Sequence, residues 1–125
     1  MKTRLFILLA LAFSFSNCST NTEFDVDHIS GNYRGVFERN GVTSTVEIRF
    51  IDGTFLGESE IEKFPAICNG VYSTAENRIT FTNNCVWTAD FDWSLILSGE
   101  WTFSRNRSEL ILFKSNGDKY TLIRQ

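Results

Sequence analysis

The residues with the most chemical potential stand together in one short stretch, Trp87-Thr88-Ala89-Asp90-Phe91-Asp92-Trp93, just after Cys85. Aromatic faces supply contact area and carboxylates supply oriented acceptors, so this composition is typical of a surface that stacks on a sugar or takes a partner's side chain. We therefore expect a candidate binding surface made of Trp87, Asp90, Phe91, Asp92 and Trp93. The alternative is structural: the two Trp side chains would close one end of the fold while the two Asp side chains shape a turn.

Catalytic and metal chemistry find little support in the same residues. A glycosidase needs two carboxylates about 5 to 9 Å apart across a substrate cleft, which a chain of 125 residues struggles to build around Asp90 and Asp92. Calcium could use their oxygens with Asn83 and Asn84, but the spacing matches no recognisable calcium loop. A serine triad lacks both its Gly-x-Ser-x-Gly turn and a nearby His. We expect no enzyme activity, no catalytic residue, no metal and no cofactor.

The three cysteines divide into a pair and a single residue. Cys68 and Cys85 would form a disulfide in an oxidising compartment. A redox or nucleophilic thiol would need a neighbouring base, and the one histidine lies at position 28. A structural disulfide is therefore our prediction for this pair.

The elements that must position these residues are strands. Apolar and polar side chains alternate from Val42 to Phe50 and from Trp93 to Phe103, and Asn40-Gly41, Asp52-Gly53 and Asn116-Gly117 favour two-residue type I′ hairpin turns. Gly99 would bend the longest strand. The pattern predicts about eight antiparallel strands: Tyr33 to Arg39, Val42 to Phe50, Thr54 to Ile61, Ile67 to Ser73, Arg78 to Thr82, Asp92 to Ser104, Glu109 to Lys114 and Lys119 to Arg124. We predict an all-β, small up-and-down barrel, with a two-sheet sandwich as the alternative.

The amino terminus has the order of an export signal. Lys2 and Arg4 precede an apolar run from Leu5 to Ser16, which is too short for the roughly 20 residues of a membrane-spanning helix. We expect residues 1–17 to be a signal peptide, residues 18–30 an acidic flexible tether and residues 31–125 the barrel domain.

The net charge limits the classes of partner that we expect. The chain has 12 basic and 15 acidic residues, a net charge of −3. Removing residues 1–17, which contain Lys2 and Arg4, leaves 10 basic and 15 acidic residues, a net charge of −5. With this balance and no basic patch, we expect no nucleic-acid partner.

The stretch Phe15-Ser16-Asn17-Cys18 resembles a bacterial lipoprotein signal, in which the cysteine after the cleavage site is acylated. With the acidic tether, the meander and the late strand Lys119-Tyr120-Thr121-Leu122, the chain is similar to the short lipocalin-like domains of exported bacterial lipoproteins; Gly31-Asn32-Tyr33 is similar to their Gly-x-Trp opening, with Tyr for Trp. The resemblance implies lipidation at Cys18, a membrane partner and a place in the cell envelope, at the outer membrane. Cleavage after Ser16 would instead give a secreted or periplasmic soluble protein.

Two functions follow from these expectations. The first is binding of a small apolar ligand, confined to a barrel mouth because nine Phe, three Trp and three Tyr in the exported chain can fill the interior themselves. The second is a tethered protein-interaction or inhibitor module that uses the loop from Trp87 to Trp93 to bind another envelope protein.

Overall fold

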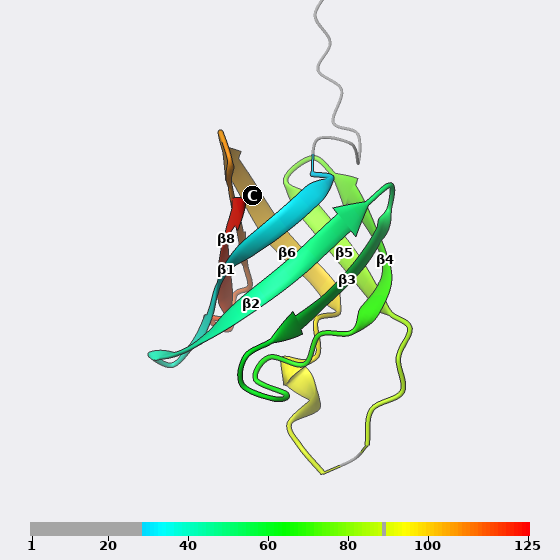
Figure 1. Ribbon diagram of the computed structural model, residues 1–125, viewed down its shortest axis with the longest axis vertical. Helices are drawn as coiled ribbons and strands as arrows, with labels where there is room; N and C mark the ends of the chain where they lie inside the picture. The colour runs from blue at the N-terminus through cyan, green and yellow to red at the C-terminus, as the bar shows by residue number, and fades with distance from the viewer. Residues whose placement is uncertain (1–28, 89) are drawn as a thin grey trace, which may run out of the picture.

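The computed structural model describes residues 29–88 and 90–125, which form a closed barrel of eight antiparallel strands (Figure 1). The strands are β1 (Gly31–Arg39), β2 (Val42–Ile51), β3 (Thr54–Ser59), β4 (Asn69–Ala75), β5 (Arg78–Asn83), β6 (Gly99–Asn106), β7 (Glu109–Phe113) and β8 (Lys119–Arg124). Each strand pairs with the next, and β1 pairs with β8 to close the sheet. The prediction of an all-β, up-and-down barrel is confirmed, and the sandwich alternative is wrong because the sheet has no break.

Three parts of the amino-terminal prediction lie outside the described residues: the signal segment, Cys18 and the tether as far as residue 28. Ile29, which we placed in the tether, is 1% exposed and packs in the core, so the packed domain begins at least two residues earlier than expected. Within the described residues, no helix is both long and apolar enough to cross a bilayer.

The two ends of the barrel differ. At the end where β1 begins and β8 finishes, which we call the turn end, the connections are the two-residue turns Asp52-Gly53, Glu76-Asn77 and Arg107-Ser108. At the opposite end, the loop end, lie the Asn40-Gly41 turn, the segments 60–68 and 84–98, and the turn 114–118 (Figure 1). The predicted binding residues, which lie on one of the long segments, are therefore collected at one end.

Turn chemistry explains some of these connections. Asn40, Gly41, Asp52 and Gly53 all have positive φ, as type I′ turns require, which confirms two of the three predicted turns. The third is wrong: β7 and β8 are joined by five residues, in which only Gly117 has positive φ. The Asn116 side chain instead accepts the Asp118 N–H at 2.9 Å, forming a local turn that lengthens the connection.

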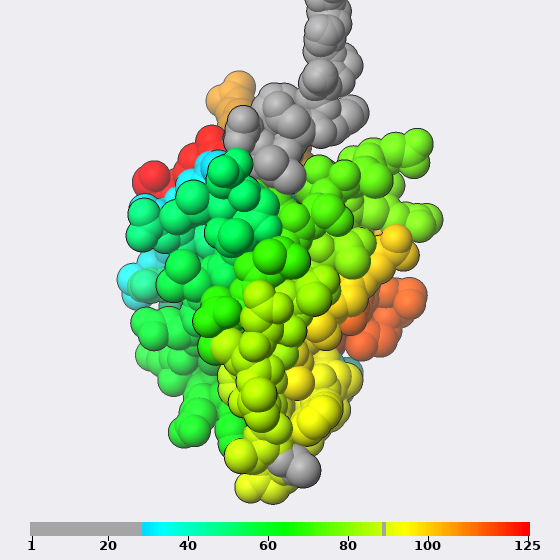
Figure 2. Space-filling view, turned by 90° about the vertical axis from the view of Figure 1, so that its right-hand side faces the viewer, coloured from blue at the N-terminus to red at the C-terminus, as the bar shows by residue number. Residues whose placement is uncertain are grey.

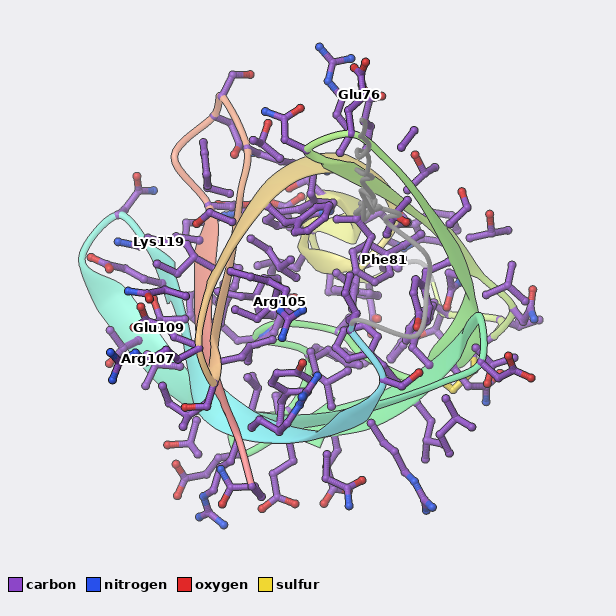
Figure 3. The ribbon with its side chains drawn as sticks, turned by 90° about the horizontal axis from the view of Figure 1, so that it is seen from above. Glu76, Phe81, Arg105, Arg107, Glu109 and Lys119 are labelled. Carbon is purple, nitrogen blue, oxygen red and sulfur yellow. A yellow bond between two sulfur atoms is a disulfide. The ribbon has the colours of Figure 1, made fainter. Side chains whose placement is uncertain are left out.

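Aromatic side chains fill the barrel interior. Eight buried rings belong to one apolar cluster: Tyr33, Phe37, Phe50, Phe55, Tyr72, Phe81, Trp101 and Tyr120. Neighbouring ring centroids lie 4.9 to 6.4 Å apart, mostly edge to face or tilted. Figure 3, viewed from the turn end, shows Phe81 inside the wall and Glu76, Arg107, Glu109 and Lys119 outside it. Buried and more exposed side chains alternate along β1, β2 and β8, as period two requires.

The predicted strand from Asp92 to Ser104 is wrong in its first half. Trp93–Leu95 forms a short 3₁₀ helix, η2, because the Asp92 carboxylate accepts hydrogen bonds from the Ser94 N–H and hydroxyl. Gly99, with φ +81°, begins β6 rather than bending it. The apolar alternation in this stretch serves a plug at the loop end, not a strand.

The boundary between β3 and β4 also differs from the prediction. β3 ends at Ser59 rather than Ile61, since the Ser59 hydroxyl turns to carbonyl oxygens of Ile61 and Pro65, 2.7 Å away in each case. β4 begins at Asn69 rather than Ile67, whose side chain is buried in the core.

Candidate functional site at the loop end

Two segments build the loop end and hold each other in place. The disulfide between Cys68 and Cys85 joins the end of segment 60–68 to the start of segment 84–98, as predicted. Ala66 exchanges backbone hydrogen bonds with Leu95 and Leu97, and Ala66, Ile96 and Leu97 are buried over the barrel. Residues 84–88 and 90–98 lie along one face of the molecule and at its lower end, beside segment 60–68 (Figure 2).

Trp87 and Phe91 form a partly buried ring pair in this loop. Their centroids are 5.8 Å apart with an edge-to-face tilt, and the Trp87 Nε1–H donates to Asn83 Oδ1 at 3.3 Å. Lys63 reaches over from the neighbouring turn, with Nζ 5.1 Å from the Phe91 centroid. These rings lie on the outside of the loop end rather than inside the barrel.

Trp93 is the exposed aromatic of the loop. The residue is 54% exposed, and its Nε1–H donates to the Thr88 carbonyl at 2.9 Å. The ring is therefore anchored at one edge while much of its surface faces solvent, which is the arrangement of a contact residue with little rotamer entropy to lose on binding. Because neither Trp87 nor Trp93 is buried, the alternative that they close the barrel end is wrong. Leu97 and its neighbours do so instead.

Asp90 and Asp92 diverge and do not form a catalytic pair. Asp90 accepts a hydrogen bond from Thr88 Oγ1 at 3.1 Å and lies 3.8 Å from Lys63 Nζ. Asp92 faces Ser94 and Arg39, and the hydrogen bonds from Ser94, reinforced by the Arg39 charge, lower the pKa of Asp92. In residues 29–88 and 90–125, no three His, Cys, Asp or Glu side chains gather in an arrangement that could hold a metal ion.

An ion pair that we did not predict from the sequence lies below η2. Arg39 binds Asp118 through two hydrogen bonds of 2.7 and 2.6 Å, and the same guanidinium reaches Asp92 at 3.1 Å and the Ser94 carbonyl at 3.3 Å. The side chains of Arg39 and Asp118 are 16% and 3% exposed. The hydrogen bond with Asp118 is the main cause of the raised pKa of Arg39. Arg39 therefore links Asp92 and Ser94 of the loop to Asp118, which is buried at the same end of the barrel.

A signal for this ion pair does exist in the sequence. Arg39 has the parity of the inward residues Tyr33 and Phe37, and Asp118 has the parity of Tyr120 and Leu122. In a barrel closed by β1 and β8, opposite charges at these positions must lie at the same end. The ion pair is therefore predictable from the inward-facing positions of Arg39 and Asp118, once the sheet is known to close.

Lys114 lies at the same end of the barrel, near this ion pair. Its Nζ sits 4.7 Å from the centre of the Trp101 ring and donates to the Ser98 carbonyl at 3.3 Å. Burial lowers the pKa of Lys114, and burial raises the pKa of Tyr120 well above its ordinary value. Asp118 and Tyr120 are both buried beneath the loop.

A separate groove of about 540 Å³ crosses the outer wall over β1, β2 and β3. Its lining mixes Arg34, Arg49, Glu47 and Glu58 with the apolar side chain of Leu56. None of the residues predicted to bind a partner lines it, whereas all five of those residues lie in the loop at the barrel's end.

None of the protein families, curated proteins and solved structures compared with the chain matches it.

Proposed function

We propose that this protein is a lipid-anchored, non-enzymatic binding module of the cell envelope that uses the loop from Trp87 to Trp93 to hold a partner protein. The observation that carries the proposal is Trp93, half exposed and anchored by its indole N–H at the tip of a rigid barrel. Interface anchors are typically aromatic side chains displayed on loops of a rigid scaffold.

Rigidity of the loop supports the same function. A disulfide at Cys85, the Arg39 ion pair at Asp92 and the backbone bonds of Ala66 with Leu95 and Leu97 hold described parts of the loop before any partner arrives. A pre-organised loop loses less conformational entropy on binding than a free one.

The anchor and location belong to the proposal as well. The lipoprotein-like signal at Cys18 and the oxidised pair Cys68–Cys85 support export to an oxidising compartment at the outer membrane, and the eight-stranded meander supports a place among lipocalin-like lipoproteins. Cys18→Ser is expected to release the protein from the membrane fraction, while retention of the variant there would argue against acylation.

A small apolar ligand at the barrel mouth is the second candidate. Ile96 and Leu97 of the long segments are buried at the loop end, next to the aromatic interior, so a ligand displacing them would meet aromatic side chains. The interior rings already contact one another, which is why we favour the interaction module. A non-covalent apolar molecule in native mass spectra of protein extracted from its envelope would reverse this order.

The decisive test is site-specific photo-crosslinking in the cell of origin. A photoreactive side chain replaces Val86, which is 97% exposed in the loop, or Val36, which is 39% exposed on the barrel wall. We expect a discrete adduct with a protein from position 86 only. Trp93→Ala should abolish that adduct, whereas the matched control Phe113→Ala, another exposed aromatic, should preserve it. Equal adducts from both positions, or an adduct indifferent to Trp93→Ala, would refute the function.

A further inference from the structure

Lys63 places a cation of the chain itself beside Phe91 and Asp90 in the loop. Lys63 Nζ lies 5.1 Å from the Phe91 ring centre, 3.8 Å from Asp90 Oδ1 and 3.4 Å from Thr88 Oγ1, to which it donates a hydrogen bond. An aromatic face, a carboxylate and a hydroxyl around one ammonium group form a recognised cation-binding arrangement. Since the side chain of Asp90 is 80% exposed, most of this carboxylate remains open to a second cation.

Thr88 connects this arrangement to Trp93. Its hydroxyl donates to Asp90 at 3.1 Å, and its carbonyl accepts the Trp93 indole N–H at 2.9 Å. Trp93 and Asp90 are thus held on the same residue. Among the described residues, the cation–π contacts involve Phe91, Trp101 and Tyr33, so the exposed Trp93 face carries no cation of its own.

The two long segments at the loop end carry mostly negative charge. Segments 60–68 and 84–98 contain four acidic residues, Glu60, Glu62, Asp90 and Asp92, against the single base Lys63, a net charge of −3. All four carboxylate residues are exposed. Such a surface draws in a cationic partner and repels an acidic one.

We infer that the loop recognises a lysine or arginine side chain on its partner protein, which stacks on Trp93 and pairs with Asp90, and that Lys63 competes for the same carboxylate in the free protein. The inference rests on the proposed function and adds the chemistry of the partner. Arginine suits the site because its flat guanidinium can stack on the indole while its N–H groups reach a carboxylate.

The test is a titration of the full mature protein with synthetic peptides, followed by tryptophan fluorescence. One peptide alternates arginine with glycine, and the control peptide of equal length has glutamine at each arginine position. We expect only the arginine peptide to bind, and its affinity to fall as ionic strength rises from about 0.05 to about 0.5 M. Equal binding of both peptides, or no binding of the arginine peptide, would overturn the inference.

Two substitutions separate recognition from general electrostatics. Asp90→Asn should weaken binding of the arginine peptide about tenfold, the effect of losing roughly one charged hydrogen bond. Glu100→Gln is the matched control, because Glu100 is also exposed and paired with a base, Arg78, but lies on the barrel wall. This control should leave the affinity unchanged, and an equal loss in both variants would contradict a specific role for Asp90.

Lys63→Met tests the competition. Removing the internal cation should strengthen binding of the arginine peptide about threefold or more, as expected when a competing state is removed. Weaker binding by this variant would show that Lys63 only braces the loop and would refute the competition.

The crosslinking experiment distinguishes failure of the inference from failure of the function. If the position-86 adduct persists undiminished in Asp90→Asn, the interaction module stands and the cationic contact is wrong. If no adduct forms from position 86 even in the unsubstituted protein, the proposed function itself fails.

Discussion

The ion pair between Arg39 and Asp118 predicts an unequal response to the loss of its two partners. Asp118 is 3% exposed and Arg39 is 16% exposed, so the carboxylate depends more strongly on its partner than the guanidinium does. In Arg39→Met the apolar stem is retained, while Asp118 keeps only the hydrogen bond from Asn116 Nδ2 at 3.3 Å. A buried charge without its partner should then destabilise the fold.

The magnitudes follow from the geometry. Arg39→Met should lower the free energy of unfolding by about 3 to 5 kcal/mol, the usual cost of breaking a buried pair from one side. Asp118→Asn should cost about 1 to 2 kcal/mol, because Arg39 retains Asp92, the Ser94 carbonyl and some contact with water. The double variant leaves no buried charge, so it should cost clearly less than the sum, with a coupling of about 2 kcal/mol or more.

Urea unfolding of the four proteins with the disulfide intact measures this cycle, with fluorescence and circular dichroism as independent probes of two-state behaviour. Effects that add within about 0.5 kcal/mol would refute the reasoning, since independent sites behave in that way. Amide exchange gives a second readout. Because Arg39 also holds Asp92 and the Ser94 carbonyl, Arg39→Met should increase exchange at residues 93–97 more than at the turn end.

Three further predictions concern the barrel and its disulfide. A Cβ at Gly35 would lie 1.9 Å from a backbone carbonyl of β8, so Gly35→Ala should lower the free energy of unfolding by about 3 kcal/mol or more. Gly41→Ala, in open space at φ +81°, should lower it by about 1 to 2 kcal/mol. Urea unfolding that reverses this order would contradict the close approach of β1 and β8. Replacing Cys68 and Cys85 together by Ser should lower the unfolding free energy by about 3 kcal/mol on the chain-entropy treatment, and an unchanged urea midpoint would argue against that account. Burial raises the pKa of Tyr120, so above about pH 10 the unfolded chain ionises this phenol while the folded chain does not, and the free energy of unfolding should fall as pH rises. Tyr120→Phe should make that fall less steep. If both proteins show the same dependence of stability on pH, ionisation of Tyr120 does not cause the fall.

Local chemistry explains why the barrel could be predicted. Asn40-Gly41 and Asp52-Gly53 accept positive φ at little cost, and alternation on the flanking strands leaves one face for the core. The turns at Glu76-Asn77 and Arg107-Ser108 could not be foreseen in this way, because Glu and Arg rarely adopt positive φ. Those turns exist because the paired strands around them demand a two-residue connection.

The sequence predicted which residues belong to the candidate site but not how they are arranged. The stretch from Trp87 to Trp93 follows from the residue types of one short segment, and the pairing of Cys68 with Cys85 follows from cysteine parity. Which Trp faces solvent, and why Asp90 and Asp92 take different partners, depended on contacts between segments distant in the sequence.

The sequence by itself determined the strands, most of their order of pairing and the aromatic content of the core, because period-two patterning and turn chemistry act over a few residues. Only the tertiary structure decided that residues 93–97 become a plug rather than a strand, and that Arg39 meets Asp118 across 79 positions of sequence. Closure of β1 on β8 brings these charges together, and a capping carboxylate held by Arg39 outweighs an apolar alternation that local propensity alone assigns to a strand.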